Sequence, residues 1–269
     1  SFIDGLAVDA NSSFGGAVNT SNKAIIYESN FVNNKTSMSG GAIKARTVSV
    51  FDSTFEGNQS SEGGAIYVDA GYYRTGYINN EIRDSLFIEN KSTNTVNYPG
   101  SDGGAISSRY GEVEVINSEF KGNISEYGSG GAIHSSSQLF TVRNSKFINN
   151  VSSGGGAIHS DYLTGNAISV VNVYNSLFKS NTATKCGGAI KANKLTVSGS
   201  VFESNIAQEV YGEGTNTCGG AVWVSSIFNS YNSLYVKNVT AVNIAYHQNS
   251  QVVNNIFFNN SRISRCDNG

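Results

Sequence analysis

Residues 130–150 read GGAIHSSSQLFTVRNSKFINN, and the chain repeats this stretch with variations. Residues 40–58 read GGAIKARTVSVFDSTFEGN, and residues 187–205 read GGAIKANKLTVSGSVFESN. A Gly-Gly-Ala-Ile/Val motif therefore alternates with a Phe-x-x-Asn motif, and the shortest repeats span about 23 to 25 residues. A period of this length indicates a repeat architecture in which each unit packs on the next.

Each unit contains short stretches in which apolar and polar residues alternate, as they do in strands. In the unit at 40–58, Ile43 and Ala45 share a face. Val48 and Val50 then face one way, and Phe55 faces the same way after a bend. Three short strands per unit are too few to bury an apolar face alone. We therefore expect each strand to pair in parallel with its equivalent in the next unit, about 4.8 Å away.

The predicted fold is an all-β, right-handed parallel β-helix with three-strand rungs and about nine or ten rungs. Glycine pairs and asparagines suit its tight corners. A β-propeller is the main rival, but its blades need roughly 40 residues each. We expect residues 1–269 to form one domain, with 234–269 as atypical terminal rungs. There the expected Phe-x-x-Asn becomes VTAVN at 239–243, which we interpret as a slipped or bulged motif.

The alternation of the two motifs over nearly the whole chain resembles the repeats of chlamydial polymorphic outer-membrane proteins and of related adhesin-like β-helix proteins. The resemblance implies a secreted or surface-displayed β-helix that acts in adhesion, often as part of a larger protein. It implies no catalytic residues. The chain starts with Ser1, and this also predicts a mature or excised segment.

The composition narrows the range of partners. Charged residues make up 14% of the chain and the net charge is −2, so nothing indicates nucleic-acid binding. No apolar run approaches the roughly 20 residues of a membrane helix, so we expect no direct membrane insertion. The predicted partner is a surface glycan or protein, in an extracellular or cell-surface location, and no cofactor is expected.

One strip of the predicted β-helix carries most of the candidate binding residues. The residue after each GGA[IV] motif points outward if the Ile or Val points inward, and so does the residue two positions further on. Such a strip could bind a glycan by ring stacking and charged hydrogen bonds. The alternative is an ordinary polar surface that binds nothing. The predicted ligand-binding residues of the strip are Lys44, Arg46, Tyr67, Arg109, His134, His159, Asp161, Lys191 and Trp223.

His134 and His159 occupy the same register in adjacent units, with Asp161 nearby. Their side chains could converge as a metal-binding or an acid–base group. Two histidines and one carboxylate are a sparse set, so we predict no metal site, no catalytic residue and no enzyme. The alternative is a polysaccharide lyase or hydrolase on the same scaffold, which would need clustered acidic residues.

Four insertions break the period, at 67–80, 91–102, 161–169 and 206–217. Their tyrosines, Tyr72 and Tyr73 among them, either contribute to recognition or fold back over the rod.

A further alternative function is an extracellular filament, because the strand edges at the ends of a β-helix can pair with another copy.

Cys186 and Cys218 each precede a GGA motif in successive units. Their α-carbons should lie about 5 Å apart, within reach of a disulfide bond. Two buried thiols are the alternative, and Cys266 could pair elsewhere, stay free or displace this pairing.

Asn-x-Ser/Thr sequons that coincide with the repeated Asn should be unable to carry sugar if those amides form an inward ladder. The remaining glycosylation candidates are Asn11, Asn19, Asn238 and Asn259.

Overall fold

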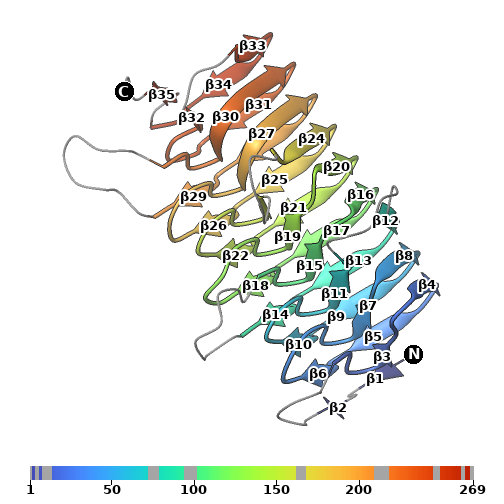
Figure 1. The fold of residues 1–269 in the computed structure, drawn as a ribbon. Coiled ribbons are helices and arrows are strands. Elements are labelled where there is room, and N and C mark those ends of the chain that lie inside the picture. The colour runs from blue at the N-terminus through green and yellow to red at the C-terminus, as the bar shows by residue number, and fades with distance from the viewer. Residues whose placement is uncertain are drawn as a thin grey trace.

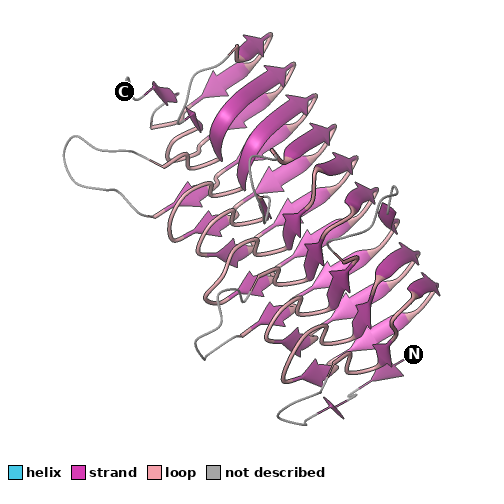
Figure 2. Ribbon diagram, viewed as in Figure 1, coloured by secondary structure: helices cyan, strands magenta, loops and turns pink. Residues whose placement is uncertain are grey.

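The computed structural model describes residues 2–3, 6–7, 14–71, 79–93, 102–161, 168–208, 218–244, 249–261 and 264–266. These residues form strands, turns and loops, and none of them is helical (Figure 2). Accordingly, this part of the chain offers no helix that could span a membrane. The strands stack into one continuous rod that runs from the N-terminus to the C-terminus (Figure 1).

The Phe sheet is the most regular of three parallel sheets and contains one strand from each rung. Its ten strands confirm the expected number of rungs. Each strand is centred on the Phe of the Phe-x-x-Asn motif or on its equivalent. In spatial order they are β1 (Phe2–Ile3), β5 (Asn30–Val32), β9 (Thr54–Glu56), β13 (Leu86–Ile88), β17 (Glu119–Lys121), β21 (Lys146–Ile148), β25 (Leu177–Lys179), β28 (Val201–Glu203), β31 (Leu234–Val236) and β34 (Ile256–Phe258).

The wide sheet takes two consecutive strands from most rungs. The strands after the GGA motifs, or at the equivalent positions of the last rungs, are β3 (Val18–Asn19), β7 (Ile43–Ala45), β11 (Ile66–Asp69), β15 (Ile106–Arg109), β19 (Ile133–Ser136), β23 (Ile158–Ser160), β32 (Val242–Ile244) and β35 (Ser264–Cys266). The strands that follow them are β4 (Lys23–Tyr27), β8 (Thr47–Phe51), β12 (Asn79–Arg83), β16 (Glu112–Ile116), β20 (Leu139–Arg143), β24 (Val170–Tyr174) and β33 (Gln251–Val253). Two long strands, β27 (Ile190–Ser198) and β30 (Val222–Tyr231), each take the place of both strands of their rung in this sheet.

The short sheet consists of two-residue strands that follow the repeated Asn, and the sequence pattern did not reveal these strands. They are β2 (Leu6–Ala7), β6 (Lys35–Thr36), β10 (Gln59–Ser60), β14 (Lys91–Ser92), β18 (Ile124–Ser125), β22 (Val151–Ser152), β26 (Thr182–Ala183) and β29 (Ile206–Ala207). Throughout the three sheets each strand pairs in parallel with its equivalent in the next rung. The predicted right-handed parallel β-helix is therefore confirmed, with the three predicted strands of each rung joined by the short strand that follows the Asn.

Equivalent apolar side chains stack along the interior. In the Phe sheet, consecutive rings lie parallel with centroids 4.6–4.9 Å apart, and Tyr235 takes the place of Phe between Phe202 and Phe257. The Ile of the GGA motifs forms a second buried column. Each rung thus buries its apolar residues on the rungs above and below it.

The repeated asparagines form a buried hydrogen-bonded ladder. The backbone N–H and the side-chain amide of each Asn both donate to Oδ1 of the next Asn, as at Asn123 and Asn150, where both distances are 3.0 Å. The same amide nitrogen also donates to the carbonyl of a Phe in the preceding rung, 3.0 Å away at Phe87. These amides point inward, which confirms that the repeated sequons there are closed to sugar.

The double glycine lets two rungs approach closely at a corner. Gly130 has a φ of +69°, a conformation in which β-carbons are disfavoured. A β-carbon on Gly131 would lie 2.1 Å from the carbonyl oxygen of Gly156 in the next rung. Any side chain at that second glycine would therefore push the two rungs apart.

The structure corrects our interpretation of the C-terminal rungs. The motif is not slipped, because Tyr235 and Asn238 occupy the Phe and Asn positions of the rung. The residues at 239–242 instead replace the Gly-Gly-Ala-Val motif, since Val242 pairs with Val222. The pattern was misread because the Phe of the motif is a Tyr in this rung.

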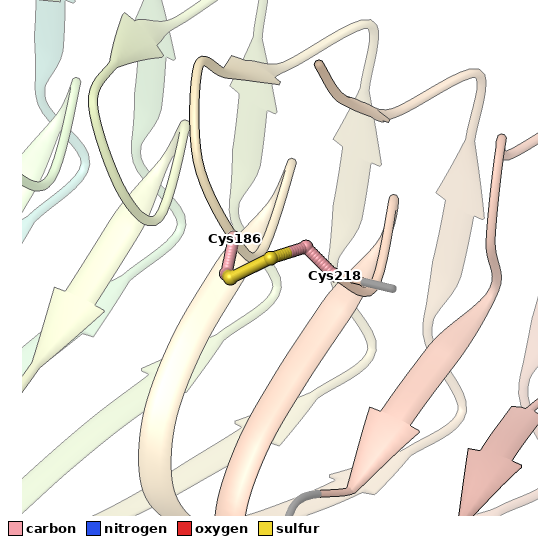
Figure 3. Close-up of a disulfide and its surroundings, with 2 residues drawn as sticks. All are labelled: Cys186 and Cys218. Atoms are coloured by element: carbon pink, nitrogen blue, oxygen red, sulfur yellow. A yellow bond between two sulfur atoms is a disulfide. The ribbon is translucent and has the colours of Figure 1, made fainter. Parts of the chain in front are cut away.

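Cys186 and Cys218 form a disulfide bond between successive rungs, which confirms the predicted pairing (Figure 3). Their α-carbons lie 4.6 Å apart. The backbone of Cys266 pairs with that of Ile244, but its side chain lies outside the described part of the chain.

Candidate functional site

The strip that follows the GGA motifs exists as one column of register-paired residues on the outer side of the wide sheet. Starting at β7, Lys44 pairs with Tyr67, and the column continues through Ser107 to the two histidines. It ends with Lys191 on β27 and Trp223 on β30. Arg46 lies half-buried at the bend after β7.

The column is less exposed than the sequence predicted. Tyr67, His134 and His159 expose only 6%, 5% and 8% of their surface, whereas Lys44 and Lys191 are half-buried. The expectation of an open strip along the whole rod is therefore wrong for its centre. Part of the reason is that residues just before the GGA motifs contact this surface. The alternation of residues within the strands does not predict where these residues lie.

Glu62 is one of these residues. Its carboxylate receives two hydrogen bonds from Arg109, at 3.0 and 2.9 Å, and a third from Ser107 at 3.0 Å. Burial raises the pKa of Glu62, and the neighbouring guanidinium opposes that effect. Burial also raises the pKa of Tyr67 above its usual range. The predicted ligand residues Arg109 and Tyr67 thus belong to a buried polar cluster centred on an acid that the sequence analysis missed.

Three of the predicted residues meet at the centre of the strip. Asp161 Oδ1 lies 3.3 Å from His134 Nε2, and its Oδ2 lies 3.9 Å from His159 Nε2. On the other side of His134, Asp102 Oδ2 lies 3.8 Å from Nδ1. Within the described residues, these two imidazoles and the carboxylate of Asp161 are the group whose donor atoms could hold a metal ion.

The two histidines differ in charge. Burial opposes the charged form of His134, but the carboxylates of Asp102 and Asp161 outweigh it and raise its pKa to about 9. Burial and the neighbouring charge of His134 lower the pKa of His159 to about 3. Burial alone would raise the pKa of Asp161, but its ion pair with His134 lowers it below the usual range. At neutral pH the cluster therefore contains the imidazolium of His134, the neutral imidazole of His159 and the carboxylate of Asp161.

Towards both ends of the strip, cations lie over aromatic rings. The Nζ atom of Lys44 lies 3.1 Å from the centroid of Phe14, and that of Lys191 lies 5.4 Å from the centroid of Trp223. Burial lowers the pKa of both lysines. Lys44, Lys191 and Trp223 are half-buried, so a large ligand can reach these two cation–ring pairs.

The remaining predicted sites have different outcomes. Tyr72, Tyr73 and Asn11 lie outside the described residues. Asn19 and Asn259 are exposed and stay predicted glycosylation sites. Asn238 is wrong as a candidate, because it is 1% exposed and its amide donates to Asn260 in the ladder.

Comparison with known proteins finds one recurring match. A family model described as the Chlamydia polymorphic membrane protein repeat matches residues 52–69, 117–136, 144–161 and 175–193. Each match contains one Phe-x-x-Asn motif and the GGA motif that follows it. No curated protein and no solved structure matches the chain. The stacked parallel strands form a right-handed parallel β-helix, and four segments of the chain match the repeat of the chlamydial polymorphic membrane protein family.

Proposed function

We propose that the chain is an extracellular or cell-surface adhesin-like module that recognises a glycan or a protein. The observation that carries the proposal is the fourfold match to the repeat of a surface-associated membrane protein family. The fold agrees with such a role, because the repeated residues are used to build the rod and only the outward positions vary.

The reachable ends of the strip supply the recognition chemistry. A half-exposed aromatic ring can stack on the apolar face of a sugar. A lysine beside it can donate charged hydrogen bonds to a carboxylate or sulfate group. The Lys191–Trp223 and Lys44–Phe14 pairs offer both groups together, and they lie towards opposite ends of the same column. The expected ligand is therefore an extended, acidic glycan or an acidic protein surface.

Binding of the purified chain to a glycan array and to extracellular matrix proteins tests this function. Trp223→Ala and Lys44→Ala should each weaken binding about tenfold or more, as for residues at the centre of an interface. Arg143→Ala is the matched control, because Arg143 also lies over an aromatic ring, with its guanidinium carbon 4.5 Å from the ring centroid of Tyr174. This pair lies on β20 and β24, the second strands of their rungs in the wide sheet, away from the strip. Absence of binding to every glycan and protein, or an equal loss in the control, would refute the proposal.

The other functions considered from the sequence stay predictions. The absence of catalysis is tested by incubating the chain with polysaccharides and measuring reducing ends. Self-association through the ends of the β-helix is tested by analytical ultracentrifugation over a range of concentrations. Concentration-dependent rods without glycan binding would favour the filament alternative.

A further inference from the structure

We propose that His134, His159 and Asp161 form a binding site for one divalent metal ion of the Zn²⁺ class. This inference concerns the buried centre of the strip and does not depend on the adhesin function. It replaces the prediction from sequence that the protein has no metal site.

The positions of the donor atoms agree with a single small cation. The candidate donor atoms of the three residues all lie within 4.8 Å of one another. The pairs that include Asp161 are 3.3 and 3.9 Å apart. A tetrahedral site with bonds of about 2.0–2.2 Å places its donor atoms roughly 3.3 Å apart. Small rotations of the side chains, with release of the proton from Nε2 of His134, would therefore bring all three donor atoms onto one ion.

The backbone holds the three ligands in place before any ion binds. His134 on β19 and His159 on β23 are direct partners in the parallel ladder. Asp161 follows His159 by two residues and so returns to the same side of the strand. Ser136 donates a 3.1 Å hydrogen bond to Oδ1 of Asp161, which orients the carboxylate. Ligands on two paired strands lose little freedom on binding a metal.

The histidines lack the partners that buried imidazoles usually have. Nδ1 of each ring is buried without a hydrogen-bond partner among the described residues. The Nε2 atom of His159 is 3.9 Å from Asp161, too far for a hydrogen bond. His159 thus has a nitrogen lone pair that no described protein group uses. A buried polar nitrogen without a partner is costly, and a metal ion would supply the missing interaction.

Asp102 completes the surroundings of the site. Metal-bound histidines commonly donate their other ring N–H to a carboxylate, which raises their basicity. The Oδ2 atom of Asp102 lies 3.8 Å from Nδ1 of His134, where a small shift would form this bond. The two carboxylates favour a cation. The positive charge of Lys191 opposes cation binding, but its Nζ lies over the ring of Trp223 in the following rung.

The donor set selects the kind of ion. Two imidazoles and one carboxylate suit Zn²⁺, Co²⁺ or Ni²⁺, whereas Mg²⁺ and Ca²⁺ prefer sites made of oxygen atoms. Three protein ligands leave at least one coordination position for water or an exogenous group. Because the side chain of Asp161 is 45% exposed, the ion can enter from that side.

Metal titration of the full chain tests the proposal. Protein freed of metal by a chelator is titrated with ZnCl₂ by calorimetry and with CoCl₂ by visible absorption. We expect one saturable site per chain. His134→Gln, His159→Gln and Asp161→Asn should each weaken Zn²⁺ binding more than about 100-fold, and Asp102→Asn about 10–100-fold.

Two control variants make the result specific. Asp69→Asn removes a carboxylate that lies in the same column as Arg109, without adjacent histidines. His247→Gln removes the third histidine of the chain, which lies outside the described residues. Both should bind Zn²⁺ like the parent protein. If circular dichroism shows that the histidine variants do not fold, Zn²⁺ binding by Asp161→Asn decides, because the side chain of Asp161 is half-exposed. No saturable binding, unchanged binding in Asp161→Asn, or equal loss in His247→Gln would overturn the proposal.

Discussion

Replacing Asn123 by Ala in the middle of the asparagine ladder tests how much the ladder stabilises the rod. The substitution removes two hydrogen bonds that Asn90 donates to Oδ1 of Asn123, from its backbone N–H and from its side-chain amide. It also removes the two bonds that the Asn123 amide donates to Phe87 and Asn150. The backbone N–H of Asn90 and one N–H of its side-chain amide then stay buried without a partner, while the amide nitrogen keeps its bond to the carbonyl of Phe55.

The magnitude follows from these two donors. A buried donor that loses its partner costs about 1–3 kcal/mol. We therefore expect Asn123→Ala to lower the free energy of unfolding by about 2–6 kcal/mol. Urea unfolding followed by far-ultraviolet circular dichroism measures the change, together with the midpoint of thermal unfolding.

Two further variants calibrate the result. Asn172→Ala removes a half-buried Asn on the outer side of β24 and should change the stability by less than about 0.5 kcal/mol. Asn260→Ala acts at the last described position of the ladder, where water can replace the lost bonds, so its effect should fall between the two. A loss below about 1 kcal/mol for Asn123→Ala, or one equal to that of Asn172→Ala, would refute the reasoning.

Three other perturbations follow from the same structure. Gly131→Ala should lower the thermal midpoint strongly, because its β-carbon would lie 2.1 Å from a backbone oxygen, whereas Gly154→Ala meets nothing closer than 3.5 Å and should have little effect. Reducing the bond between Cys186 and Cys218, which closes a separation of 32 residues, should lower stability by about 3–4 kcal/mol in urea unfolding under dithiothreitol. Expressed in a glycosylating host, the chain should carry sugar at Asn19 and Asn259 and at none of the buried ladder asparagines, as peptide mass spectrometry will show.

Much of the fold was predictable because each rung contacts equivalent positions of its neighbours. Register along a solenoid converts a sequence period directly into a spatial contact. The Phe column, the Asn ladder and the Cys186–Cys218 bond are all contacts of this kind. The substitution of Tyr235 for Phe broke the pattern in one rung, and there the prediction was wrong.

The candidate site was only partly predictable. The column from Lys44 to Trp223 follows from the register, and so does the proximity of His134 to His159. The burial of the centre of this column does not follow from the register, because it is covered by residues that are not at equivalent positions of the repeat. The two-residue strands such as β10 (Gln59–Ser60) were also missed, since a stretch that short shows no alternation.

The repeat period alone established the rod, its parallel pairing and the side chains that line its interior. The reason is that identical units can bury their apolar faces only by stacking in register. Tertiary structure decided which polar groups meet. Glu62 contacts Arg109 across 47 residues, and Asp102, which precedes one GGA motif, faces His134, which follows the next GGA motif. Such contacts join positions that are not equivalent in the repeat, so they depend on loop paths and burial that periodicity does not encode.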